Sequence, residues 1–301
     1  MKLATLTDGS RDGLLAVVSR DLTRAHFAVD IASTMQQVLD DWNFRAPQLE
    51  DLYAALNGGK LRHAFGFDAR HCMAPLPRAY LWAFCGAEDP VLTLAASDEL
   101  SGPCDAVQLS GAEDVIKVDA GVAAVIGDVP RGCAAEAALE SVRLFMLTHH
   151  WTLLPSRVSC TTSFSPVAVT PDELGMAWRD GGVHLVLRSG APGADDNNHD
   201  NDDTDDNDDN EDEAPSKLLE PSPAAHFGEL VATLARGRRL RAGSIVGCVS
   251  PLGVLGSRNG AQRRARVFQA GARVRTEALD EAGHAVFGAL DQAVTLLAAA
   301  S

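Results

Sequence analysis

The fold is decided by the stretch Lys117-Val-Asp-Ala-Gly-Val-Ala-Ala-Val-Ile-Gly-Asp-Val-Pro-Arg-Gly132. Its β-branched and small apolar residues predict a buried strand, which ends where glycine, aspartate and proline follow one another. Asp119 and Gly121 are two positions apart, so on a strand both face the same side of the sheet. Two carboxylates at this spacing would form a ligand pair for a divalent cation. Because Gly121 has no side chain, only half of such a pair is present.

The composition is that of a soluble globular protein. The 301 residues allow a large core, and 46% of them are hydrophobic. No apolar run approaches the roughly 18 residues that a membrane helix needs. The first residues contain no apolar signal core, so we expect a cytoplasmic protein. The six cysteines include no Cys-x-x-Cys pair and are expected to be free, mostly buried thiols.

The acidity of the chain is concentrated in one segment. The net charge is −15, and twelve acidic residues lie between Asp195 and Glu213 without a lysine or arginine among them. This Asp/Asn-rich tract cannot bury apolar surface, so we expect residues 194–216 to form a disordered, solvated insert. Weak calcium binding is one alternative. Another is that the tract screens the ten arginines between Arg236 and Arg275.

Residues 1–79 are expected to form a small N-terminal domain. A turn over residues 7–13 separates two short strands, which predicts a hairpin. The apolar residues from Met35 to Leu56 have helical spacing, and Pro47 is expected to divide them into two helices.

From Tyr80 onward the pattern changes to short strands separated by turns. A glycine at position 283 predicts a hairpin between two of these strands. We expect helices over residues 134–147 and 227–234, and strands over residues 183–187, 272–280 and 284–288.

Several segments together resemble one known family. They are residues 1–23, Ala74-Pro-Leu-Pro-Arg-Ala-Tyr80, Ala124-Val-Ile-Gly-Asp-Val-Pro130, Ser163-Phe-Ser-Pro-Val-Ala-Val-Thr-Pro-Asp-Glu-Leu-Gly175 and Phe287-Gly-Ala-Leu-Asp-Gln292. Their order and spacing are similar to those of the fumarylacetoacetate hydrolase family, in its bacterial form with a short N-terminal module. No single segment carries the resemblance alone.

The resemblance implies an α+β, mainly β fold. Residues 80–301 would form a roll of mixed sheets, interrupted by the acidic insert, behind the small domain of residues 1–79. It also implies metal-dependent hydrolysis of a carbon–carbon bond in diketo acids such as acylpyruvates. In that reaction Mg²⁺ or Ca²⁺ chelates the substrate, and a histidine oriented by a glutamate activates water. Residues 86–92, where the family places this histidine, contain none.

Most metal-binding residues of the family are replaced at the matching positions. The first aspartate ligand falls on Phe84, and the Glu-x-Glu pair falls on Asp119 and Gly121. The next aspartate falls on His150, and an expected lysine falls on Ser159. Asp119 and His150 are therefore the candidate metal ligands, while Phe84, Gly121 and Ser159 mark positions of the substrate cleft.

Three functions stay open. The leading hypothesis is a family member with a degenerate, weak or inactive site. The second is an active hydrolase or isomerase of diketo acids with a site rebuilt from Asp119 and His150, where Zn²⁺ is a softer candidate ion. His149 should face the opposite side of the strand and take no part. The third is a non-enzymatic protein or nucleic-acid binder that uses the arginine-rich C-terminal third, although no recognition motif accompanies the arginines. A homodimer is expected from the family.

Overall fold

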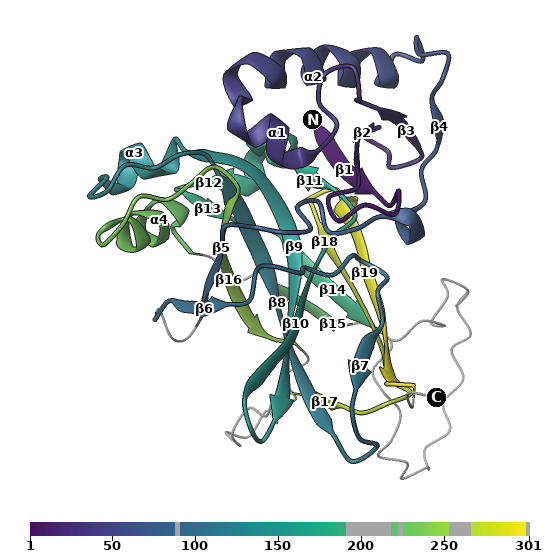
Figure 1. Ribbon diagram of the computed structural model, residues 1–301, viewed down its shortest axis with the longest axis vertical. Helices are drawn as coiled ribbons and strands as arrows, with labels where there is room; N and C mark the ends of the chain where they lie inside the picture. The colour runs from purple at the N-terminus through teal and green to yellow at the C-terminus, as the bar shows by residue number, and fades with distance from the viewer. Residues whose placement is uncertain (88–90, 191–217, 222–224, 253–265, 299–301) are drawn as a thin grey trace, which may run out of the picture.

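The computed structural model describes residues 1–87, 91–190, 218–221, 225–252 and 266–298. The acidic tract and Arg258, Arg263 and Arg264 lie outside these residues. Two sheets dominate the described part of the chain (Figure 1). The expected mainly β architecture of mixed sheets is confirmed.

The large sheet has 12 strands, in the order β4-β3-β2-β1-β11-β9-β8-β16-β5-β6, with β10 added to β9 and β17 added to β8. Its pairs are antiparallel except for β16 and β5, which are parallel. The strands are β1 (Lys2–Leu6), β2 (Leu14–Val18), β3 (Arg24–Phe27), β4 (Phe65–Gly66), β5 (Leu81–Gly86), β6 (Thr93–Ala95), β8 (Val115–Ile126), β9 (Val142–Leu154), β10 (Val158–Phe164), β11 (Ala168–Val169), β16 (Ser244–Pro251) and β17 (Val267–Phe268).

A second sheet of five strands packs against the large one, in the order β15-β14-β18-β19-β7. Its strands are β7 (Val107–Leu109), β14 (Val186–Gly190), β15 (Leu218–Pro221), β18 (Arg273–Leu279) and β19 (Ala285–Leu296). A separate pair consists of β12 (Trp178–Arg179) and β13 (Gly182–Val183). The helices are α1 (Met35–Asp40), α2 (Trp42–Asn57), α3 (Ala135–Leu139) and α4 (Phe227–Ala235), with short 3₁₀ turns at Ala69–His71 and Pro171–Ala177.

The core is divided between the two faces of the large sheet. One face carries residues such as Val118 and Leu147, which pack with Phe287 of the second sheet and Phe227 of α4. The other face packs against the N-terminal helices, which lie above β1 and β2 in Figure 1. The expected β1–β2 hairpin is confirmed, and β1 also pairs with β11. The large sheet is therefore continuous from the N-terminal segment into the rest of the chain.

The helix break was wrongly predicted at Pro47. The break lies at Asp41, whose backbone is non-helical (φ −136°, ψ 47°), and Pro47 lies inside α2. A proline removes one backbone N–H and leaves the carbonyl four residues earlier unbonded within the helix. That carbonyl belongs to Asn43 in the exposed first turn, where water can bond it. The early position of Pro47 explains why α2 continues through it.

The helix predicted over residues 134–147 is wrong in its second half. Only Ala135–Leu139 is helical, and β9 begins at Val142. Leu144, Phe145, Met146 and Leu147 are all fully buried, because β9 is covered on both faces. A strand buried on both faces has no alternation of polar and apolar residues, so its pattern imitates a buried helix.

The other expected elements are largely confirmed. The helix at residues 227–234 is α4, and the hairpin through Gly283 is formed by β18 and β19. Gly283 has φ +82°, the left-handed conformation that glycine adopts without strain. The strand expected over residues 183–187 is divided between β13 and β14. None of the six cysteines, all of which lie within the described residues, forms a disulfide, and only three of them are buried. No helix within the described ranges is long and apolar enough to cross a membrane.

Candidate functional site

Four of the five expected site positions are brought together on one face of the large sheet. Asp119 on β8 lies directly opposite His150 on β9. Gly121 is two residues further along β8. Phe84 on β5 pairs through Gly247 of β16 with Ala123, two residues beyond Gly121, so it lies on the same face. Side chains of directly paired residues, and of residues two apart, share a face of a sheet. We call the surface carrying Phe84, Asp119, Gly121 and His150 the Asp119 face.

An aromatic row occupies the Asp119 face. The ring of Phe84 contacts the imidazole of His150, with centroids 4.3 Å apart. Trp82 stacks on Phe84 at 5.4 Å and meets Phe164 edge to face at 5.5 Å. Trp82 has room because Gly247 lies beneath it; a Cβ on Gly247 would be 2.6 Å from the indole ring. Phe84, the position that the family resemblance matches to an aspartate ligand, is thus part of a packed aromatic cluster.

His150 is buried and uncharged at neutral pH. Its Nδ1 is 2.9 Å from Thr162 Oγ1, which also accepts a hydrogen bond from Trp82 Nε1 at 3.1 Å. Since the indole N–H is only a donor, the Thr162 hydroxyl keeps its own proton for His150 Nδ1. Burial lowers the pKa of His150 to about 4, although the nearby Asp119 carboxylate acts in the opposite direction.

Asp119 has a cationic partner. Lys117 Nζ donates to Asp119 Oδ2 at 2.7 Å, and the two side chains are 28% and 10% exposed. The second oxygen, Oδ1, is buried and has no hydrogen-bond partner among the described residues. The lysine ammonium therefore supplies, beside this carboxylate, the positive charge that a metal ion would otherwise supply.

Gly121 is required by the packing of β8 against β16. A Cβ on Gly121 would overlap the carbonyl oxygen of Cys248 and would lie only 2.8 Å from Cα of Val249. Both are backbone atoms of the neighbouring strand, so no rotation of a side chain can relieve the overlap. If position 121 matches the second carboxylate of the family pair, as the resemblance implies, the backbone of β16 leaves no space for that side chain here.

Ser159 stands apart from the other four positions. It lies opposite Thr152 near the hairpin end of β10, next to an irregularity in the pairing with β9, and it is exposed.

His149 points away from the Asp119 face, as expected. In the core between the sheets, its Nδ1 is 3.1 Å from Gln292 Oε1. The same oxygen accepts a hydrogen bond from Trp151 Nε1 at 3.1 Å. Burial lowers the pKa of His149 to about 4, although the bond to Gln292 acts in the opposite direction.

The residues of the Asp119 face do not fit a hard divalent cation. Mg²⁺ and Ca²⁺ take several oxygen ligands, commonly from more than one carboxylate. The face offers one carboxylate that Lys117 already neutralises and one imidazole, while Phe84 and Gly121 offer no donor. Across the part of the chain that is described, no group of three or more His, Cys, Asp or Glu side chains is placed to hold a metal ion.

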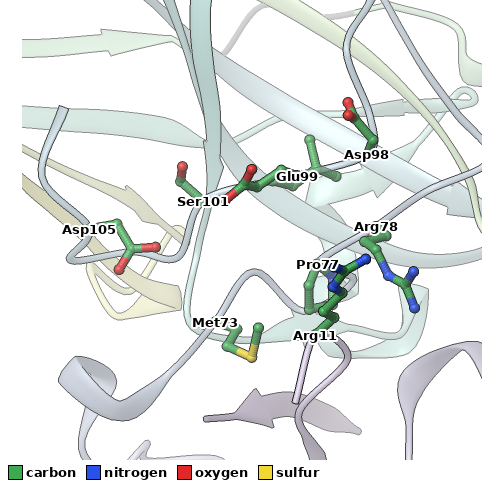
Figure 2. A pocket seen from close by; sticks show the side chains of 9 residues that line it. Arg11, Met73, Pro77, Arg78, Asp98, Glu99, Ser101 and Asp105 are labelled. Carbon is green, nitrogen blue, oxygen red and sulfur yellow. The ribbon is translucent and has the colours of Figure 1, made fainter. Parts of the chain in front are cut away.

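Two pockets lie elsewhere, where the N-terminal segment meets the rest of the chain, and neither is lined by the expected site residues. One has a volume of about 630 Å³. Figure 2 shows Arg11 and Arg78 beside Pro77 on one side of it and Asp98 and Glu99 on the other. Arg78 is already bound to Asp12 through two contacts, of 2.9 and 2.5 Å.

The second pocket has a volume of about 840 Å³, and we call it the junction pocket. It is lined by Lys2, Arg20, Asp21, Leu22, Asn57, Asp172, Glu173, Asp280, Gly283, His284, Ala285 and Val286.

Three residues of the Asp119 face were missed from the sequence. Lys117 and Trp82 each stand two positions before an expected site residue, so the spacing that relates Asp119 to Gly121 also places them on this face. Thr162 gave no such signal, because its position depends on the pairing of β10 with β9.

The arginine-rich third is less available for binding than its sequence indicates. Arg273 forms a two-point ion pair with Asp291, at 2.7 and 2.8 Å. Arg275 is shared between Glu277 at 2.8 Å and Asp291 at 3.4 Å. These arginines lie on β18 among their partners. The exposed arginines at 236, 238, 239 and 241 follow α4.

Comparisons with known proteins agree on the family. The profile described as fumarylacetoacetase N-terminal domain 2 matches residues 1–78, and the profile described as fumarylacetoacetate (FAA) hydrolase C-terminal matches residues 84–295. The chain has no significant match among curated proteins.

Solved structures similar to this chain include maleylpyruvate hydrolase from Sphingobium sp. SYK-6, at 17% identity and a TM-score of 0.66, covering 99% of this chain and 100% of that one. Another is a probable 2-hydroxyhepta-2,4-diene-1,7-dioate isomerase from Mycobacterium abscessus, at 15% identity and a TM-score of 0.66, covering 99% of both chains. The fumarylacetoacetate hydrolase of Exiguobacterium antarcticum has 15% identity and a TM-score of 0.64, covering 99% of this chain and 100% of that one. At these identities the likeness shows the fold.

Proposed function

Because this chain belongs to the fumarylacetoacetate hydrolase family, we propose that it is a member that has kept the fold but no longer performs metal-dependent hydrolysis of diketo acids. In this proposal the chain is a non-catalytic binding protein. The observation that carries it is the packing at Gly121. A metal ligand lost through one substitution could in principle return through the reverse substitution. At position 121 this route is blocked, because the backbone of β16 occupies the space that a side chain would need.

Two further observations support the proposal. Lys117 neutralises the one carboxylate that is left, and a cation arriving at Asp119 would have to displace that ammonium. Phe84 packs on His150, so the imidazole would have to leave the aromatic row to reach a ligand position. Each step costs part of the free energy that a metal gains from a prepared site.

Titration calorimetry with MnCl₂, MgCl₂ and ZnCl₂, followed by turnover of acetylpyruvate, tests the proposal. We expect no saturable binding tighter than about 1 mM, which corresponds to about 4 kcal/mol, and no turnover above the background rate. Asp119→Asn is the matched control, because it keeps the shape of the side chain and removes its charge. Micromolar binding and turnover that are both lost in this variant would overturn the proposal.

A rebuilt metal site is the second candidate function. It is favoured by one observation, the buried Oδ1 of Asp119, which has no partner within the described ranges and faces the same side as His150. One carboxylate and one imidazole suit Zn²⁺ better than Mg²⁺. A manganese ion and pyruvate are named in a second structure of the Sphingobium enzyme. The expected homodimer stays a prediction, which sedimentation velocity would test.

A further inference from the structure

The junction pocket holds a buried charge that forms no ion pair with a carboxylate of the described residues. Lys2 on β1 is 4% exposed, and its ammonium donates to the carbonyl oxygen of Val286 on β19 at 2.6 Å. No described Asp or Glu carboxylate lies within ion-pair distance of Lys2 Nζ. An ammonium has three donors, so two are left for other acceptors. A buried charge that is not paired is unfavourable, and proteins seldom keep one unless it has a partner.

The lining around Lys2 carries both signs of charge. Arg20 is 75% exposed and lies 3.7 Å from Glu173, whose carboxylate is 6% exposed. Asp172 is 73% exposed, and the Met1 ammonium lies 3.5 Å from Asp172 and 3.3 Å from Glu173. Asp21 and Asp280 also line the pocket. Burial lowers the pKa of Lys2 below its ordinary value, whereas Glu173 acts in the opposite direction. The ammonium therefore lies in a dry position, surrounded at longer range by carboxylates.

This distribution selects the charge type of a ligand. A simple anion would pair with Lys2 and Arg20 but would be repelled by Asp21 and Asp280, the two carboxylates of the lining that form no ion pair with a described lysine, arginine or N-terminal ammonium. A simple cation would suit those carboxylates and would leave Lys2 without a partner. A molecule with a carboxylate at one end and an ammonium at the other satisfies both sets of groups. The volume of about 840 Å³ is within the range of small-molecule sites.

We propose that the junction pocket binds a small zwitterion of the amino-acid class, with its carboxylate on Lys2 and Arg20 and its ammonium among the acidic side chains at the rim. The site is separate from the Asp119 face and uses none of its residues, so it stands or falls independently of the proposed loss of hydrolysis.

Thermal-shift measurements and titration calorimetry with the common L-amino acids test the site on the full chain. We expect at least one of them to bind saturably and to raise Tm. The N-acetyl and carboxamide forms of the tightest ligand each block one charged end. Each should bind at least about tenfold more weakly, since losing one charge-assisted contact corresponds to a factor of ten or more.

Lys2→Met should weaken binding at least about tenfold, and Lys60→Met, at an exposed lysine outside the pocket, should leave it unchanged. Arg20→Gln changes an exposed side chain without threatening the fold and should weaken binding about threefold, the effect of an exposed ion pair. The proposal is overturned if no amino acid shifts Tm, if the blocked forms bind as tightly as the free one, or if Lys2→Met and Arg20→Gln both bind like the wild type.

Discussion

The Asp119 face and the junction pocket each bury one charged side chain, but within the described residues only the charge of Asp119 is paired with an opposite charge. On the Asp119 face the carboxylate has an ammonium at 2.7 Å, and aromatic rings fill the neighbouring positions. In the junction pocket the ammonium of Lys2 has one carbonyl oxygen and no carboxylate within ion-pair distance among the described residues. A buried charge with a partner closes a site, whereas one without a partner leaves a place for a ligand. The Asp119 face, which we matched to the family's metal site, is thus closed to a ligand, whereas the junction pocket is the site that we propose for binding.

The largest expected effect is on the Asp119 face, at Gly121. Gly121→Ala should lower the free energy of unfolding by about 3 kcal/mol or more, because the new Cβ overlaps the backbone of β16. Urea denaturation measures the loss. Gly66→Ala is the control, since Gly66 also lies in a strand and a Cβ there meets nothing within 4 Å. If the Gly121 variant were as stable as the control, β16 would not exclude a side chain at position 121. The contrast between the Asp119 face and the junction pocket would then fail.

Acid should destabilise the protein through His149 and His150, the two histidines that are buried in the described part of the chain. Their pKa values are about 4 in the folded protein, against 6.5 in the unfolded chain, so the unfolded state binds more protons between these values. The contribution of the two neutral histidines to the free energy of unfolding is therefore present above pH 6.5 and is lost as the pH falls toward 4. Each histidine should contribute a loss of about 2 kcal/mol between pH 7 and pH 5.

Denaturation curves of His150→Gln at pH 7 and pH 5 would assign half of this loss to the Asp119 face. The variant should show about half of the wild-type pH dependence, whereas His63→Gln, at an exposed histidine, should show all of it. A full pH dependence in His150→Gln would mean that His150 is not buried in a neutral form.

Replacing Lys117 and replacing Lys2 should change the stability with opposite signs, which sharpens the comparison. Lys117→Met leaves Asp119 buried without a partner and should destabilise by about 2 kcal/mol, a value reduced because Lys117 is 28% exposed. The double variant Lys117→Met, Asp119→Asn should recover most of the loss, which a double-mutant cycle measures. A single loss that the second change does not recover would mean that the two side chains are not coupled.

Lys2→Met should have the smallest effect, of the opposite sign. It removes a buried charge that forms no ion pair with a carboxylate of the described residues, and we expect a gain of about 1 kcal/mol in the absence of ligand. Thermal denaturation in ligand-free buffer is the measurement. A loss comparable to that of Lys117→Met would show that Lys2 is already well compensated, and the contrast between the two regions would disappear.

The sequence predicted the Asp119 face better than it predicted what closes it. Period-two spacing places Asp119 and Gly121 on one side of a strand, and the family resemblance adds Phe84 and His150. Contacts between strands depend instead on which distant segments of the chain pair, and in which register. The overlap at Gly121 depends on β16, more than one hundred residues later in the chain, and the pairing of β10 decides the position of Thr162. Register between distant strands is not encoded in local spacing.

The errors in the fold have the same physical origin. Residues 144–147 have both faces buried, so their periodicity carries no information about which element they form. Pro47 is tolerated because its carbonyl partner lies in an exposed helical turn, and exposure is a property of the folded chain. In contrast, α4 has one apolar face and the β18–β19 hairpin has a glycine turn, and both were predicted correctly because their signals are local.

The hydrogen bond between Lys2 and Val286 has a consequence for the order of folding. It joins residues 284 positions apart, and β1 must also find β11, whose Val169 pairs with Lys2. During synthesis the first strand leaves the ribosome long before either partner exists. Contacts of such long sequence separation close late and slow folding. A ligand in the junction pocket would therefore recognise only chains whose first and last strands have met, and its binding would report that folding is complete.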